Sequence, residues 1–236
     1  MCAQSNKENN WRKSARPVAN GRYPAREHCS KCGLCDSYFV AKVKEACPFL
    51  GDGMSRLENM EQRVHGRSSE TSQSHEVTES SSEDDELFFG VHDVMLAARV
   101  TRPIVGAQWG GLVTTIACQM LVTGAADAVL CVGSDPDDHF SPRPTLARTP
   151  EQVLACKGVK PVLASLLELL PLIDGSHVKR LVVCGVGCQI QAFRSIEPYL
   201  ALDRLFILGT NCVDNAPARK ALDKFLHVAS QSPQVF

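Results

Sequence analysis

Apolar residues in the second half of the chain form short blocks separated by polar turns. Three blocks have the length of buried strands, and they cover residues 128–133, 181–184 and 205–208. A segment with helical spacing of its apolar residues follows each block. Strands that alternate with helices are typical of βαβ units. The pattern therefore predicts an α/β fold, with a mostly parallel sheet and flanking helices.

The helices that this pattern predicts differ in how clearly their ends are marked. The best start is at Thr149-Pro150-Glu151-Gln152, which places Thr at the N-cap, Pro at the first helical position and Gln at the third. The expected helices cover residues 94–100, 109–122, 163–173, 189–199 and 216–229, besides the one that begins after Thr149.

The first third of the chain has a different character, and we divide the sequence into four parts. Residues 1–26 are polar and are expected to be a disordered tail or the remnant of a transit peptide. Residues 27–60 are rich in cysteine, and 61–86 form an acidic, Ser-rich insertion or linker with few apolar residues. Residues 87–236 make up the α/β domain.

Composition excludes several classes of protein. The chain has 236 residues, a net charge of −1 and 44% hydrophobic residues, so nothing in its charge favours nucleic acid as a partner. No apolar stretch reaches the roughly 18 residues of a membrane-spanning helix. Eleven cysteines are many, and those outside the cysteine-rich segment lie in apolar blocks, where a thiol is usually a small core residue.

The cysteine-rich segment predicts a metal centre. Cys29, Cys32 and Cys35 are spaced three apart, and Cys47 follows after a longer gap and precedes a proline. The first spacings and the Cys-Pro ending match the run that binds 4Fe–4S clusters in bacterial ferredoxins, whereas the longer gap does not. A structural zinc site and a disulfide framework fit less well. We expect a small ferredoxin-like iron–sulfur segment here.

Glycine-bearing turns in the α/β domain are further candidates for ligand binding. The turn from Gln108 through Trp109, Gly110 and Gly111 to Thr114 opens a helix, where free backbone N–H groups could meet a phosphate. Close packing of the helix explains the two glycines equally well.

Two more turns follow strands and carry cysteines. Cys188 follows Gly185-Val186-Gly187, and Cys212 follows Gly209. Ligands of parallel sheets bind at the carboxyl ends of strands, so the two thiols could face each other there. Two cysteines do not complete a four-thiolate site, and on composition alone both are core thiols.

Two cations near turns could pair with an anion. Lys160 follows Gly158 and could face a phosphate or a reduced flavin, although a solvated lysine is the simpler interpretation. Arg143 lies between two prolines, in what we expect to be a rigid loop, and its guanidinium could bind an anion.

Several strings of the sequence resemble a known family, that of the flavin-containing beta subunit of deazaflavin-reducing hydrogenases, and within it the plant and algal branch that acts on chlorophyll. The resemblance extends over about residues 29–236. The strings are CSKCGLCD, KEACPFLGDGMSR, GAQWGGLVTTIA, SDPDDHFSPRPTLARTPEQVLA, KGVKP, CGVGCQIQAFRS and LGTNCVDN.

The resemblance implies a chloroplast enzyme with FAD and two 4Fe–4S clusters. It would take electrons from reduced ferredoxin and reduce the 7-hydroxymethyl group of chlorophyll a to methyl. A chlorophyll-type pigment is then the substrate. A ferredoxin-dependent reductase of the 8-vinyl group of a chlorophyll precursor and a truncated, non-catalytic cluster-binding protein stay open as alternatives, and so does a homo-oligomer.

The resemblance also implies roles for particular residues. Segments that contact the flavin in the family correspond to the turn Gln108, Trp109, Gly110, Gly111 and Thr114, and to Gly158 and Lys160. The cluster found in the chlorophyll branch would be held by Cys29, Cys32, Cys35 and Cys47. Cys188 and Cys212 would hold the cluster shared with the hydrogenase subunit.

The sequence departs from the family in three places. The family takes two further ligands of the shared cluster from a CxxC motif, and no CxxC follows Cys212 here. Ala164-Ser165-Leu166 stands where the family has a Ser-Pro-Asn turn. The acidic, Ser-rich insertion is also longer than expected. Independently of the family, residues 234–236 read like the start of another strand, so we expect a truncated product or a fragment.

Overall fold

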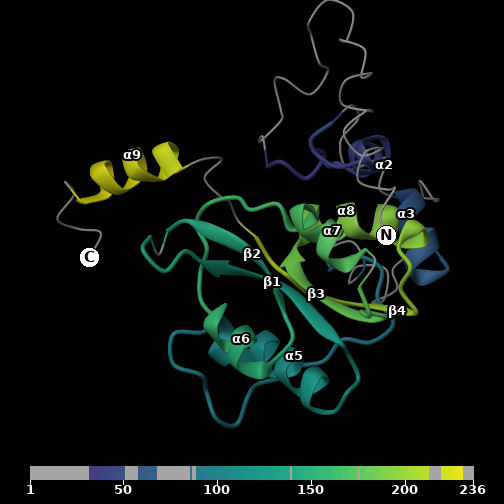
Figure 1. Ribbon diagram of the computed structural model, residues 1–236, viewed down its shortest axis with the longest axis horizontal. Coiled ribbons are helices and arrows are strands. Elements are labelled where there is room, and N and C mark those ends of the chain that lie inside the picture. The colour runs from purple at the N-terminus through teal and green to yellow at the C-terminus, as the bar shows by residue number, and fades with distance from the viewer. Residues whose placement is uncertain are drawn as a thin grey trace, which may run out of the picture.

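The computed structural model describes residues 32–50, 58–67, 86, 89–138, 140–174, 176–212 and 219–230. Its centre is a four-stranded sheet in the order β2-β1-β3-β4 (Figure 1). The strands are β1 (Ala128–Ser134), β2 (Pro142–Ala147), β3 (Arg180–Val186) and β4 (Arg204–Thr210). The protein is therefore of the mixed α/β class, and the three predicted strands are confirmed.

The sheet is parallel except at one edge. β1 pairs with β3 and β3 with β4 in parallel, whereas β2 runs antiparallel to β1. We expected a rigid loop around Arg143, and that expectation is wrong, because Pro142 and Pro144 belong to β2 and lie opposite Ser134 and Val132. Proline cannot donate to a ladder of hydrogen bonds, so it is tolerated where a strand forms the edge of a sheet.

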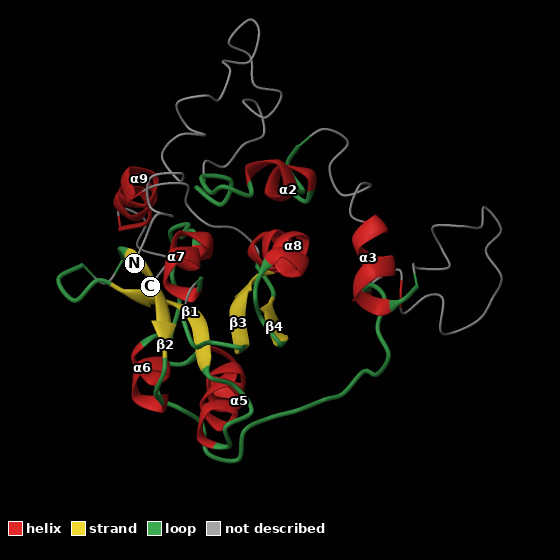
Figure 2. Ribbon diagram, turned by 45° about the vertical axis from the view of Figure 1, so that its right-hand side comes forward, coloured by secondary structure: helices red, strands yellow, loops and turns green. Residues whose placement is uncertain are grey.

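Helices cover both faces of the sheet (Figure 2). One face carries α5 (Leu112–Val122) and α6 (Pro150–Ala155), with Ala117, Val129 and Val182 in the core between them. The short 3-10 helix η5 (Leu166–Leu169) and the helices α7 (Leu170–Ile173) and α8 (Gly187–Ile196) lie on the other face, and η6 (Glu197–Tyr199) continues α8. Leu130, Leu181 and Phe193 are fully buried in this second core.

The N-terminal helices lie outside this layer arrangement. α2 (Val40–Glu45) packs against α8, and α3 (Glu58–His65) makes fewer contacts with the same helix. Leu34 and Val43 join the core under α8, so the cysteine-rich segment is anchored to the α/β domain. α9 (Arg219–Ser230) lies to one side of the sheet in Figure 1. The ferredoxin-like fold predicted for the cysteine-rich segment is not shown, since residues 32–50 form one helix and turns.

Two predicted helices differ from the observed structure. Residues 94–100 are all described and contain no helix, although their apolar spacing predicted one. Val94, Met95 and Leu96 are exposed, so no packed face stabilises a helix there, and short helices need such packing. Residues 163–173 form η5 and α7 instead of one helix. Pro171 stands in the first turn of α7, where its missing N–H costs nothing.

The remaining helices confirm the predicted pattern, with small shifts at their ends. The capping box of α6 is formed in full: Gln152 N donates to Thr149 Oγ1 at 3.4 Å, and Thr149 N donates to Gln152 Oε1 at 3.3 Å. α5 begins three residues later than predicted. The turn before it is the 3-10 helix η4 (Gln108–Gly111), in which Trp109, Gly110 and Gly111 have φ of 54°, 66° and 91°. A continuous α-helix cannot include this left-handed backbone.

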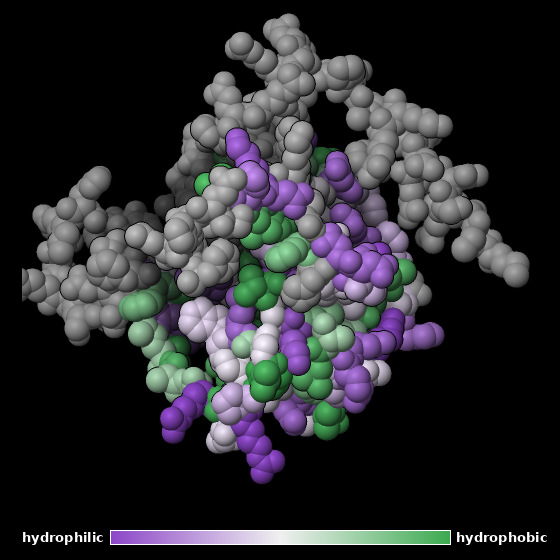
Figure 3. Space-filling model, turned by 90° about the vertical axis from the view of Figure 1, so that its left-hand side faces the viewer, coloured by the Kyte–Doolittle hydropathy of each residue, from purple (hydrophilic) through white to green (hydrophobic). Residues whose placement is uncertain are grey.

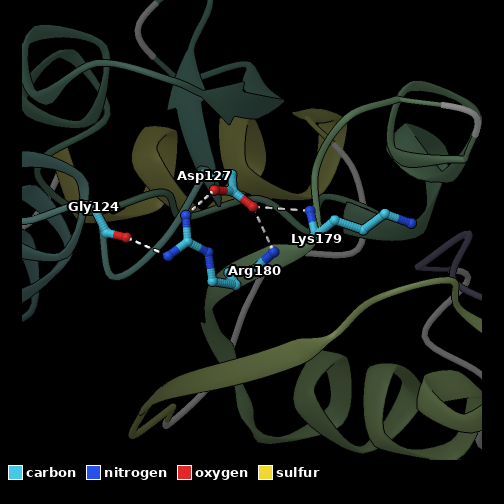
Figure 4. A network of polar contacts seen from close by, with 4 residues as sticks. All are labelled: Gly124, Asp127, Lys179 and Arg180. Atoms are coloured by element: carbon cyan, nitrogen blue, oxygen red, sulfur yellow. Dashed lines mark hydrogen bonds and ion pairs between the residues drawn. The ribbon is translucent and has the colours of Figure 1, made fainter.

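A polar network ties β1 to β3 at the ends opposite the carboxyl edge (Figure 4). Asp127 accepts hydrogen bonds from Lys179 N at 2.9 Å, Arg180 N at 2.7 Å and Arg180 Nη2 at 2.5 Å. Arg180 Nη1 also donates to Gly124 O at 2.6 Å. The guanidinium and the two backbone N–H groups lower the pKa of Asp127 to about 2. One carboxylate thus fixes where the two parallel strands begin.

Several sequence expectations fall outside the described residues. They concern the N-terminal tail, the insertion between Arg67 and Glu86, and residues 234–236. The division of the chain into four parts stays a prediction.

Among the described residues no helix is long and apolar enough to cross a membrane. On the face drawn in Figure 3, hydrophobic and hydrophilic residues are interspersed.

Candidate functional site: a cavity at the carboxyl edge of the sheet

A cavity of about 430 Å³ opens where β3 and β4 end. Its walls come from five places: the η4 turn and α5, the middle of β1, α6 and the turn after it, the segment before η5, and the ends of β3 and β4 with the residues that follow them. Parallel α/β sheets bind their ligands at this edge. The cavity is therefore the first candidate for a ligand site.

Most of the predicted flavin-contacting residues line this cavity. Gln108, Trp109 and Thr114 contribute from one side, and Gly158 and Lys160 contribute from the turn after α6. These two segments are more than 40 positions apart in the sequence, and only the fold brings them together. Their role as flavin contacts stays a prediction.

Gly110 and Gly111 do not line the cavity, and the structure gives them a packing role. A Cβ on Gly111 would lie 2.9 Å from Ile104 Cβ. Ile104 N donates to Gly110 O at 2.9 Å, which closes the loop before α5. The turn leaves Trp109, which lines the cavity, 73% exposed to solvent. A left-handed backbone at a non-glycine residue costs energy and often marks a functional site.

Lys160 is one of two lysines in the cavity wall, beside Lys157. Its Nζ donates to three backbone carbonyls, Cys156 O at 2.8 Å, Lys157 O at 2.9 Å and Gly158 O at 3.0 Å. Burial lowers the pKa of Lys160, and the neighbouring thiols Cys156 and Cys131 oppose that shift. The ammonium is thus held in place and partly desolvated, which strengthens its interaction with an anionic group in the cavity.

Gly158 permits the turn that places Lys160. Its φ is +90°, and a Cβ there would lie 3.1 Å from Gly106 O. Both the backbone conformation and the close approach therefore favour glycine at this position.

Gln189 is a cavity residue that the sequence analysis missed. It lies in the first turn of α8 and is only 6% exposed. Its Nε2 donates to Ala164 O at 2.6 Å, whereas its Oε1 has no partner among the described residues. An acceptor buried without a partner is costly, so it fits a ligand that donates a hydrogen bond. The sequence did contain a signal for this role, because Gln189 is a polar residue just after the turn from β3 to α8.

The structure brings the predicted cluster ligands Cys188 and Cys212 together. The strand ends before them, Val186 and Thr210, lie opposite each other in the sheet. Burial, together with the nearby thiols of Cys32 and Cys212, raises the pKa of Cys188 to about 11. Cys32 of the N-terminal run is therefore close to Cys188, so the two predicted cluster sites adjoin.

The metal centres themselves stay predictions. Cys32, Cys35 and Cys47 are described and partly buried, whereas Cys29 lies outside the described residues. Among the side chains that the structure describes, no three cysteine, histidine or acidic groups are arranged to hold a metal ion. Thiolates are the donors that iron–sulfur clusters require, so the chemistry of the donor set fits even though it is not assembled.

Three further thiols line the cavity, and the sequence analysis had treated them as core residues. They are Cys131 on β1, Cys156 after α6 and Cys184 on β3. All three border the apolar core on the α5 side of the sheet. The chain is thus an α/β protein whose sheet edge opens on a cavity with a fixed cation, an unpartnered acceptor and several thiols.

Comparison with known proteins agrees with this class. Residues 95–171, which include the η4 turn, Gly158 and Lys160, match the family model described as "Coenzyme F420 hydrogenase/dehydrogenase, beta subunit N-term". The resemblance to the hydrogenase beta subunit is thereby confirmed.

Among individual proteins, one similar relative is a plant enzyme. The chain is 53% identical over 225 residues to 7-hydroxymethyl chlorophyll a reductase, chloroplastic, from Oryza sativa subsp. japonica, covering 95% of this chain and 45% of that protein. It is 46% identical to the uncharacterized protein all1601 of Nostoc sp., covering 91% of this chain and 51% of that one. The F420 hydrogenase subunit beta of Methanosarcina barkeri is 27% identical over 56% of this chain and 48% of its own length.

A solved structure shares the fold. The F420-reducing NiFe hydrogenase complex from Methanosarcina barkeri, studied by xenon derivatization, contains a chain with a TM-score of 0.50 and 24% identity, covering 60% of this chain and 54% of that one. The chain described here spans about half the length of the curated relatives that it matches.

Proposed function

We propose that this chain acts in a ferredoxin-dependent iron–sulfur flavoprotein that reduces the 7-hydroxymethyl group of chlorophyll a to methyl. The observation that carries the proposal is the 53% identity to the rice reductase over 95% of the chain. The cavity supports it, because the two segments expected to contact flavin line one wall each. The chain would belong to the F420 hydrogenase beta subunit family, and would work in the chloroplast.

The cavity fits a flavin in chemistry. Lys160 supplies a fixed cation for the anionic reduced ring or for a phosphate of FAD. Gln189 Oε1 supplies an acceptor for a donor group such as the ring N3–H. Val113, Val153 and Val162 give the cavity apolar walls that exclude water. A bound flavin would accept single electrons and deliver them as a pair.

The cysteines divide into two proposed electron-transfer sites. Cys29, Cys32, Cys35 and Cys47 would hold one 4Fe–4S cluster, and Cys188 and Cys212 would supply two ligands of a second. Because Cys32 lies near Cys188, electrons from reduced ferredoxin would have a short route to the cavity edge. The pigment, a chlorophyll with an oxidised C7 substituent, would meet the flavin at that edge.

The test is an anaerobic assay of the purified chain. We expect protein-bound flavin and iron, and conversion of 7-hydroxymethyl chlorophyll a to chlorophyll a that depends on reduced ferredoxin. Omission of ferredoxin is the control. A preparation that binds flavin and iron but acts only on an 8-vinyl chlorophyll precursor would contradict the substrate, and a preparation without flavin would contradict the whole proposal.

One alternative is favoured by a specific observation. The chain spans about half of its relatives' length, so it could bind a cluster without catalysing the reaction. Iron and flavin in the preparation with no turnover of either pigment would support this alternative over the reductase.

A further inference from the structure

The thiols in the cavity are not equivalent, and two of them form a pair. Cys131 points from β1, opposite Thr145 of β2, and is 7% exposed. Cys156 ends α6 on the same side of the sheet and is more accessible. A Cβ on Gly133, the next residue on the same face of β1 as Cys131, would lie 3.2 Å from Cys156 Sγ. The two thiols are therefore neighbours, and each shifts the pKa of the other. Both line the cavity and are therefore within reach of small solutes.

The surroundings of Cys156 stabilise its anionic form. The Cys131 thiol, the Thr145 hydroxyl and the Lys160 ammonium all lower the pKa of Cys156, against the effect of its burial. The neighbouring Cys156 sulfur and burial raise the pKa of Cys131. Cys156 is therefore the thiolate of the pair, and Cys131 keeps its proton.

The pKa values of the other two thiols of this core, Cys184 and Cys118, are raised. Burial and the negative charge of Cys156 raise the pKa of Cys184 to about 12. Burial and Glu151 raise the pKa of Cys118, whose thiol donates to Pro150 O at 3.6 Å. Reactivity follows thiolate character, so these two serve as internal references.

We propose that Cys131 and Cys156 are a peroxide-sensitive thiol pair, in which Cys156 is the site of oxidation and Cys131 closes a disulfide with it. The inference rests on the two neighbouring thiols, their cavity location and the Lys160 ammonium bound to Cys156 O, and it needs neither flavin nor a cluster. It therefore stands apart from the proposed reductase activity.

The chemistry balances with a hydroperoxide as the oxidant. The Cys156 sulfur attacks one peroxide oxygen, so that an S–O bond forms, the O–O bond breaks and water or an alcohol leaves after protonation. The Cys131 sulfur then attacks the Cys156 sulfenic acid, forming the S–S bond and releasing water with the Cys131 proton. Two electrons pass from the thiols to the peroxide, and a dithiol reductant reverses the change.

The disulfide would tie β1 to the turn that carries Lys160. That turn is folded around the Lys160 ammonium, through the carbonyls of Cys156, Lys157 and Gly158. Oxidation would therefore act on the position of the cation in the cavity wall.

The first measurement is the alkylation rate of each cysteine in the whole purified chain. Iodoacetamide labelling is followed by mass spectrometry, and cleavage before Asp127 separates Cys118 from Cys131. At pH 7 we expect Cys156 to react at least about tenfold faster than Cys118 and Cys184, because only thiolates react. Equal rates for the three cysteines would overturn the proposal.

The second measurement follows oxidation by hydrogen peroxide. We expect a cross-linked peptide pair containing Cys131 and Cys156 that disappears after treatment with dithiothreitol. In Cys131→Ala, Cys156 should instead be trapped as a sulfenic acid by dimedone, and Cys118→Ala, the matched control, should still form the cross-link. Absence of the Cys131–Cys156 cross-link in the unmodified chain would overturn the proposal without any variant.

Discussion

Lys160 shows how a single side chain can serve both the fold and the candidate site. Three carbonyl oxygens within 3.0 Å hold its ammonium, and burial disfavours its charge. A charge kept in such a place is more effective toward an anion than one in water, because the local dielectric constant is lower. Sequence alone gave no reason to separate it from a solvated lysine.

At this residue we predict that Lys160→Met weakens flavin binding by about tenfold, which corresponds to one charge-assisted hydrogen bond. Flavin retained by the purified chain and its dissociation constant are the measurements. Lys42→Met on α2, outside the cavity, is the control and should bind flavin as the unmodified chain does. Equal flavin affinity in Lys160→Met and Lys42→Met would show that Lys160 does not bind the flavin.

At the scale of elements, the η4 turn decides how α5 meets the loop before it. Gly111 and Gly124 both have a left-handed backbone, with φ of 91° and 67°. A Cβ on Gly111 would meet Ile104, whereas a Cβ on Gly124 would meet nothing within 4 Å. A side chain at Gly124 would therefore cause backbone strain alone, whereas one at Gly111 would cause both strain and steric overlap.

We predict that Gly124→Ala lowers the free energy of unfolding by about 1 kcal/mol, the cost of the left-handed conformation. Gly111→Ala should cost a further 1–3 kcal/mol, roughly the penalty for overpacking. Urea denaturation measures both values. Adding Ile104→Ala to Gly111→Ala should recover part of the loss, and no recovery would mean that Ile104 is not the obstacle.

The Asp127 network joins two strands and makes their pairing depend on pH. The pKa of Asp127 is lowered to about 2 in the folded chain, below the value of about 3.9 for an unfolded aspartate. Its stabilising contribution is therefore complete above pH 4 and is lost as the pH falls toward 2.

We predict that Asp127→Asn is less stable than the unmodified chain at pH 6, and that the difference shrinks as the pH falls from 4 to 2. Thermal unfolding at a series of pH values measures it. Asp93→Asn, in an exposed loop segment, is the control and should show no such convergence. A difference that is constant over this pH range would contradict the role of the ionised carboxylate.

At the scale of the whole molecule, the N-terminal cysteine run and the α/β domain meet at one place. Leu34 and Val43 are buried under α8, and Cys32 lies close to Cys188. The fold thereby brings a segment near position 32 to a sheet edge formed some 150 residues later.

We predict that the chain, reconstituted anaerobically, binds about four iron atoms in one cluster held by the N-terminal run. Cys35→Ala should remove the iron, Cys188→Ala should leave most of it, and Cys118→Ala is the control that leaves all of it. Iron analysis and visible absorbance are the measurements. Loss of all iron in Cys188→Ala would show instead that the cluster is shared between the two segments.

The sequence by itself determined those features that depend on neighbouring residues. The three parallel strands, the capping box at Thr149 and the start of α8 follow from local apolar blocks, turn residues and side chains three positions apart. Local spacing failed at residues 94–100, since a helix of that length needs a packed face and none covers it.

Only the tertiary structure decided which distant groups share a site. It placed Trp109, Lys160 and Gln189 around one cavity, showed Gly111 to be a packing residue, and brought Cys131 and Cys156 to the same side of the sheet. The physical reason is that burial and electrostatic surroundings depend on all the elements that pack together. A thiol in an apolar strand looks the same in the sequence whether it faces the core, a cation or a second thiol.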